Sequence, residues 1–181
     1  FNSMGTVINA ARHDFTSENR LADVGLQALK ILRENPLRYI GSVARIDKDA
    51  KRNVVGTLLD YFENPSLYDN VDPRLVALKN RWGQIIDAQA ATGRSKWGVD
   101  IKLRKPDDPD GVYVPHLGKS EFGQTDKTYS DQWTRLSEKF GPARERAYPD
   151  LVSRVLADPD FMPELDPARL AEYHSGAIAT M

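Results

Sequence analysis

Apolar side chains recur at intervals of three and four residues along most of the chain, which is the period of one helix face. The clearest run covers residues 17–35, where Leu21, Val24 and Ala28 lie on one face before Asn35-Pro36 ends the pattern. Residues 37–49 are ambiguous, because helical spacing there is interrupted by Gly41. The pattern therefore predicts an N-terminal helical arm over residues 1–49.

Two further helices are predicted in the middle of the chain. In residues 50–63, Val55, Leu58 and Phe62 form one apolar stripe that stops at Asn64-Pro65. The next helix opens with Asp72-Pro73, a capping residue followed by a proline in the first turn, and closes at Gly93. A short connection favours antiparallel packing of neighbouring helices, so residues 50–93 are predicted to form a helical hairpin.

The spacing changes after Gly93 from a helical to an alternating pattern. Val99, Ile101 and Leu103 alternate with charged residues, as in a half-buried strand. A turn at residues 105–111 then leads to a second short extended run, residues 112–114. We expect a small β-hairpin around residues 99–114, inside a segment of hairpin and loop that covers residues 94–129.

The last third, residues 130–181, again has helical spacing. One helix is predicted from Ser130 to Phe140, another from Pro149, and a third after Asp166-Pro167. Together these patterns predict a mainly α protein, with residues 1–181 forming a single helical bundle into which the small β-hairpin is inserted. The helical pattern is still running at Met181, so we expect the chain to be a fragment of a longer protein.

Composition narrows the functional classes. The chain has 25 Lys and Arg against 26 Asp and Glu, and this balance gives no general support to phosphate binding. It has no cysteine, which excludes disulfides, thiolate metal sites and cysteine nucleophiles. No apolar run approaches the roughly 20 residues that a membrane-spanning helix needs, so no membrane span is predicted.

The segment Gly111–Leu117 is the best candidate for a placed chemical group, because the turn before it fixes where Tyr113 and His116 lie. A calcium loop aligned on Gly111 would have Pro106 and Leu117 at two ligand positions, so no metal is predicted. The histidines have no metal-ligand spacing. We predict no cofactor and assign no catalytic residue, but a hydrolase centred on His116, with Glu121 or an Asp of residues 107–110, is one alternative.

A second alternative is a nucleic-acid-binding face. Trp97 could stack a base while the surrounding cations follow phosphates. The competing interpretation is a charged outer strand face with Trp97 anchored in the core. The candidate binding residues are Arg94, Lys96, Trp97, Lys102, Arg104, Tyr113 and His116.

The order of several short motifs is similar to that of helical modules in the very large polyvalent and internal virion proteins of tailed bacteriophages. The resemblance spans about residues 50–181, and it implies no catalytic residue. Its motifs here are Ala90–Gly93, Gly111–Leu117, Arg146-Ala147-Tyr148-Pro149, Pro163-Glu164-Leu165-Asp166-Pro167 and Leu170–Tyr173.

Absent chemical motifs and the phage resemblance together favour a non-enzymatic structural or interaction module. Such a module would belong to a virion component or to a protein delivered with the DNA. Its expected partners are other segments of the parent protein or virion subunits, with nucleic acid as the alternative partner. The expected location is the virion or the host cytoplasm.

Overall fold

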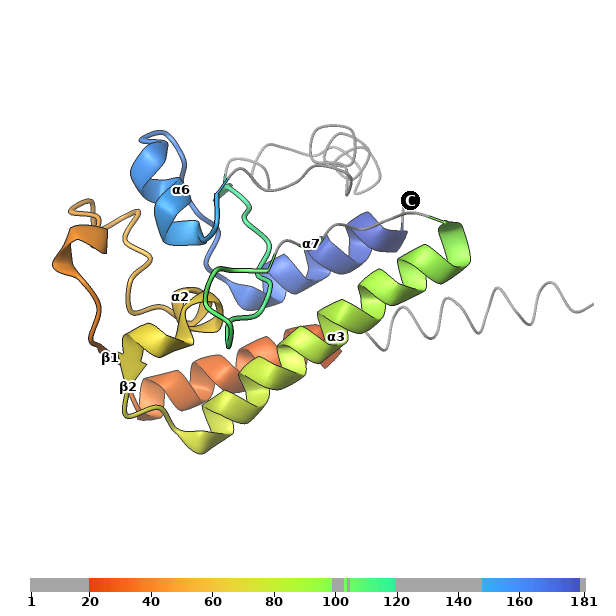
Figure 1. Ribbon diagram of the computed structural model, residues 1–181, viewed down its shortest axis with the longest axis horizontal. Coiled ribbons are helices and arrows are strands. Elements are labelled where there is room, and N and C mark those ends of the chain that lie inside the picture. The colour runs from red at the N-terminus through yellow and green to blue at the C-terminus, as the bar shows by residue number, and fades with distance from the viewer. Residues whose placement is uncertain (1–19, 99–102, 104, 120–147, 180–181) are drawn as a thin grey trace, which may run out of the picture.

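The computed structural model describes residues 20–98, 103, 105–119 and 148–179 (Figure 1). It confirms the predicted class, because this part of the chain is mainly helical with one small antiparallel sheet. A helix over residues 20–34 comes first. The other elements, in chain order, are β1 (Arg38–Tyr39), the 3-10 helix η1 (Val43–Arg45), α2 (Leu58–Glu63), the 3-10 helix η2 (Pro65–Leu67), β2 (Tyr68–Asp69), α3 (Pro73–Trp97), α6 (Leu151–Ala157) and α7 (Pro167–Ala179).

The long helices form one side of the molecule. The helix of residues 20–34 runs antiparallel to α3, and α7 packs against α3 (Figure 1). A Cβ atom added at Gly25 would lie 2.8 Å from Cβ of Pro167 and 3.3 Å from the ring of Trp82. Gly25 therefore lets the three helices meet around Trp82, which is fully buried.

The helix α2 begins later than predicted, because residues 50–57 are not helical. Gly56 has a left-handed φ of +86°, and Thr57 is extended and accepts a hydrogen bond from the Asp60 amide. These two residues start a short helix that packs against α6. The helix α3 instead runs past the predicted end at Gly93, and Gly98, at φ +64°, caps it.

The small sheet is formed by segments that were not predicted to be strands. Arg38 lies opposite Asp69 and Tyr39 opposite Tyr68 in an antiparallel register. The predicted second strand, residues 112–114, belongs to no sheet, because the Val112 amide donates instead to the carbonyl of Phe62 at 2.8 Å. Most of the predicted first strand lies outside the described residues, as does the predicted helix of residues 130–140.

The two C-terminal helices begin as their capping residues predict. Asp150 accepts a hydrogen bond from the Ser153 amide, so α6 starts at Leu151, two residues after the predicted Pro149. Asp166 accepts from the Ala168 amide at 2.9 Å at the start of α7. Between them, Gly118 and Pro163 form an isolated antiparallel bridge. This bridge ties the Gly111–Leu117 segment to the chain that enters α7.

Candidate functional site

The Gly111–Leu117 segment is an internal element of the fold. A Cβ atom added at Gly111 would overlap the carbonyl oxygen of Glu63, so only glycine allows this approach. Val114 and Leu117 are buried in the hydrophobic core. The carbonyl of Tyr113 accepts a hydrogen bond from Nε1 of Trp82 at 3.0 Å. The segment therefore passes between α2 and α3 with contacts to both.

His116 and Glu63 form a buried pair at the end of α2. Nε2 of His116 lies 2.6 Å from Oε1 of Glu63, and the two side chains are 4% and 0% exposed. The other carboxylate oxygen, Oε2, accepts the Leu151 amide at 2.7 Å. One carboxylate therefore connects α2, the Gly111–Leu117 segment and the first residue of α6.

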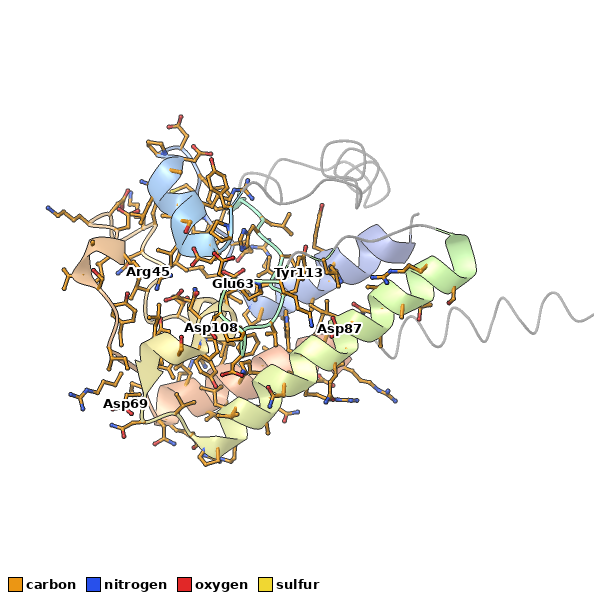
Figure 2. All side chains as sticks on the ribbon, viewed as in Figure 1. Arg45, Glu63, Asp69, Asp87, Asp108 and Tyr113 are labelled. Atoms are coloured by element: carbon orange, nitrogen blue, oxygen red, sulfur yellow. The ribbon has the colours of Figure 1, made fainter. Side chains whose placement is uncertain are left out.

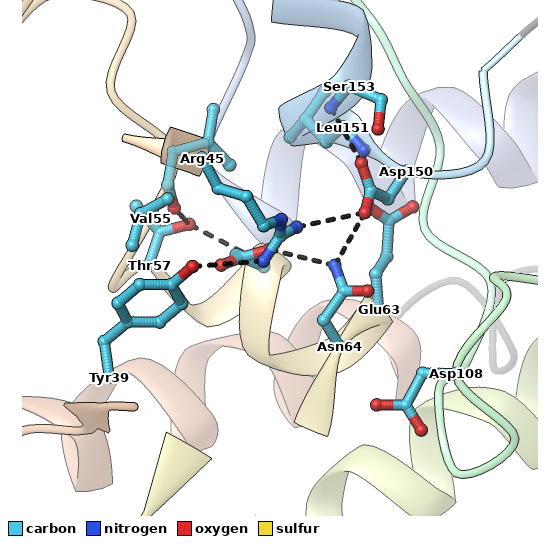
Figure 3. A network of polar contacts seen from close by, with 12 residues as sticks. Tyr39, Arg45, Val55, Thr57, Glu63, Asn64, Asp108, Asp150, Leu151 and Ser153 are labelled. Atoms are coloured by element: carbon cyan, nitrogen blue, oxygen red, sulfur yellow. Dashed lines mark hydrogen bonds and ion pairs between the residues drawn. The ribbon is translucent and has the colours of Figure 1, made fainter. Parts of the chain in front are cut away.

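Arg45 and Asn64 bridge two further acids beside this pair. The Arg45 guanidinium lies 3.0 Å from Oδ2 of Asp150 and 3.5 Å from Oδ1 of Asp60. The Asn64 amide donates to the same two oxygens at 3.1 and 3.0 Å (Figure 3). The Tyr68 hydroxyl donates to Oδ2 of Asp60. We call these seven residues the polar network: Arg45, Asp60, Glu63, Asn64, Tyr68, His116 and Asp150.

Asp60 and Asp150 both pair with Arg45, but their pKa values are shifted in opposite directions from the ordinary value of an aspartate. Burial raises the pKa of Asp60 and outweighs its hydrogen bond from Tyr68 and the charge of Arg45. Burial also acts to raise the pKa of Asp150, but its hydrogen bonds from Ser153 and the charge of Arg45 leave that pKa below its ordinary value. Burial and the Asp60 carboxylate raise the pKa of Tyr68. The network thus holds Asp150 firmly ionised and Asp60 less so.

The geometry of the polar network suits a structural role. Its carboxylates accept from donors within the protein, and its histidine and Glu63 are closed off from solvent. Buried charges are normally paired and hydrogen-bonded in this way, because an unpaired one is costly. Within the described ranges, no cluster of three or more His, Asp or Glu side chains could hold a metal ion.

The acidic turn before Gly111 is also held by internal contacts. Oδ2 of Asp108 accepts from the amide and hydroxyl of Ser66, at 2.9 and 2.5 Å. Burial acts to raise the pKa of Asp108, but these hydrogen bonds leave it lowered. The buried ammonium of Lys79 donates to the carbonyl of Asp110. His116 pairs with Glu63. Glu121 lies outside the described residues.

The proposed nucleic-acid face is described only in part. Arg94 is exposed on α3. Lys96 and Trp97 lie in the last turn of the same helix, but their side chains are not described, and Lys102 and Arg104 lie outside the described residues. Their grouping on one face stays a prediction. The ring of Tyr113 lies 5.9 Å from the ring of His174 on α7.

An exposed row of apolar side chains is the second distinctive feature of the structure. Ile40, Val43 and Ile46 are 56%, 79% and 36% exposed. The loop that carries them is held by hydrogen bonds, since the Tyr39 hydroxyl donates to the Ser42 carbonyl at 3.1 Å and Ser42 caps η1. We call these three side chains the apolar row.

Sequence reasoning missed most of the polar network. Arg45 and Asp150 are 105 residues apart, and Asn64 and Asp150 are 86 apart, so no local pattern links them. Asp60 and Glu63 carry the one available signal, because they are the two acidic residues of a short helix whose residues are all buried. In Figure 2, Arg45 lies on the side of the molecule that carries α6, Glu63 lies nearer the middle, and Asp87 lies along α3.

No family model matches the sequence, and no curated protein or solved structure shows significant similarity to it. None of the described helices combines the length and apolar character that a membrane span requires.

Proposed function

We propose that this chain is a non-enzymatic interaction module whose polar network fixes the fold and whose apolar row contacts a protein partner. The exposure of Ile40, Val43 and Ile46 carries the proposal, because three large aliphatic side chains within seven residues are costly to leave in water. The anchoring contacts of Tyr39 and Ser42 support it, since an ordered loop loses less entropy on binding.

We assign the module to a large tailed-phage protein that acts in the virion or in the host cytoplasm. The assignment rests on the similarity of its motifs to helical modules of such proteins. Residues of these motifs make structural contacts here: Gly111 packs on Glu63, Pro163 bridges Gly118, and Asp166 caps α7. These contacts support the view that the shared motifs serve the fold and do not form an active site.

The test compares two lysine substitutions in cells that produce the intact protein. Val43→Lys alters the apolar row, whereas Leu26→Lys alters an exposed leucine, 52% accessible, on the helix of residues 20–34. We expect both variants to melt like the parent protein and only Val43→Lys to lose its co-purifying partners. Equal recovery of the same partners by both variants would contradict the proposal.

Nucleic acid is the second candidate partner, because Arg94 is an exposed cation near the end of α3. A titration with single- and double-stranded nucleic acid at low and high salt separates the two functions. Binding that falls steeply with salt and is weakened by Arg94→Ala would favour nucleic acid. The hydrolase alternative instead needs an accessible imidazole, whereas the His116 side chain is 4% exposed.

A further inference from the structure

We infer that the apolar row and the cations around it form a docking site for an acidic amphipathic protein segment. This inference rests on the proposed interaction function and specifies the chemistry of the partner. It concerns the stretch from Arg38 to Lys51, which includes β1, η1 and the turn that follows.

The spacing of the apolar row matches the local backbone. Val43 is the first residue of η1 and Ile46 is its C-cap. A 3-10 helix has three residues per turn, so residues at i and i+3 lie on the same side, about 6 Å apart along the axis. Ile40 precedes Val43 by the same interval and continues the β1–β2 pairing through a 2.9 Å bond from its amide to the Leu67 carbonyl. Val43 and Ile46 therefore lie on one side of η1, and Ile40 directly follows β1, three residues before Val43.

The exposed charges near the apolar row are three cations and two carboxylates. Arg38, Lys48 and Lys51 are exposed, and none has a carboxylate within ion-pair distance among the described residues. Asp49 is the exposed acid of the same stretch, and Asp69 is the exposed acid opposite Arg38.

Other charges of the stretch are already used inside the protein. Asp47 pairs with Arg52 at 3.4 Å, and Arg45 pairs with Asp150. The charges that stay exposed to solvent are therefore three cations and two carboxylates, with aliphatic side chains between them. This surface complements a segment with an apolar face and acidic flanks.

Two other occupants fit less well. Three side chains offer a few hundred Å² at most, well below the roughly 1,000 Å² that a stable interface between two copies needs. Recognition of an anionic membrane surface typically uses a cluster of about four to eight basic residues. A single protein segment can bind weakly and transiently to a smaller area, and its carboxylates can pair with the exposed cations.

The experiment uses two synthetic amphipathic helical peptides of about 18 residues. Both carry leucines on one face, and the other face carries glutamate in the first and lysine in the second. Fluorescence anisotropy with the full chain should show about tenfold tighter binding of the acidic peptide, with the difference shrinking at about 0.5 M salt. Absence of binding by the acidic peptide, or equal binding of both, would overturn the inference.

Matched variants locate the site. The double substitution Val43→Ser and Ile46→Ser should reduce acidic-peptide binding, and Lys48→Glu with Lys51→Glu should reverse the preference. Leu26→Ser is the control and should leave binding unchanged, with circular dichroism confirming that all three fold. Binding that persists in the double serine variant, or tighter binding to anionic lipid vesicles than to the acidic peptide, would also overturn the inference. The partner-loss test of Val43→Lys does not depend on the chemistry of the partner. If the peptide test fails while Val43→Lys still loses its partners, the interaction function stands and only the acidic partner is ruled out.

Discussion

Nε2 of His116 lies 2.6 Å from Oε1 of Glu63, although the two residues are 53 positions apart in the chain. The same carboxylate accepts the first amide of α6 through its other oxygen. A buried side chain of this kind organises the fold around itself, because its removal takes a partner from His116 and the acceptor from the Leu151 amide.

Replacing Glu63 should destabilise the protein in proportion to the contacts that are lost. Glu63→Ala removes the carboxylate that contacts Nε2 of His116 and accepts the Leu151 amide, and it should cost about 3–5 kcal/mol. Glu63→Gln keeps one acceptor oxygen and should cost less. Urea unfolding measures both, with Glu172→Ala at an exposed position as the control. A loss for Glu63→Ala no larger than that of the control would show that the buried pair does not stabilise the fold.

Gly111→Ala should be more damaging than Gly56→Ala. The new methyl group at position 111 would overlap the Glu63 carbonyl, whereas position 56 has open space and only a left-handed φ of +86°. We expect a cost above about 2 kcal/mol for the first and about 1–2 kcal/mol for the second. Thermal unfolding of the two variants gives the comparison. The reverse order would mean that backbone conformation matters more than the close approach to α2.

Arg52 should stabilise the end of α6 locally. Its Nε donates to the Phe161 carbonyl at 3.2 Å, and its terminal nitrogen donates to the carbonyls of Asp158, at 2.9 Å, and Val155. Arg52→Met should cost about 1–3 kcal/mol and should speed amide hydrogen exchange at the end of α6. Lys51→Met, at an exposed neighbour, is the matched control. Exchange rates that stay unchanged around Asp158 would exclude this capping role.

Asp150 and Asp60 should change the acid stability of the protein in opposite directions. The folded pKa of Asp150 is lowered, so its contribution is complete above the unfolded pKa of 3.8 and is lost as pH falls through the folded pKa. The folded pKa of Asp60 is raised, so its protonation as pH falls through that pKa favours the folded state.

Asp150→Asn should therefore flatten the loss of stability below pH 3.8, and Asp60→Asn should steepen the loss just above it. Urea unfolding from neutral pH down to the onset of acid denaturation tests both changes. Parallel pH profiles for the parent and the two variants would contradict the opposite contributions of Asp150 and Asp60 to acid stability.

Much of the helical framework could be predicted from local signals. Asp72-Pro73 marks the start of α3 and Asp166-Pro167 the start of α7, because both sequences supply a side-chain acceptor and a proline suited to the first turn. The start of α2 was misplaced, because the apolar stripe of residues 50–63 continues through Gly56 and Thr57. The left-handed φ at Gly56 decides that boundary, and helical spacing does not report it.

The sequence by itself determined the mainly helical class and the capped helix starts. These features depend on neighbouring residues, since helix hydrogen bonds and caps span only a few positions. Tertiary structure alone decided that Tyr39 pairs with Tyr68 in the sheet and that Glu63 is the partner of His116. Strand pairing and buried ion pairs join distant parts of the chain, so their partners are set by how the helices pack.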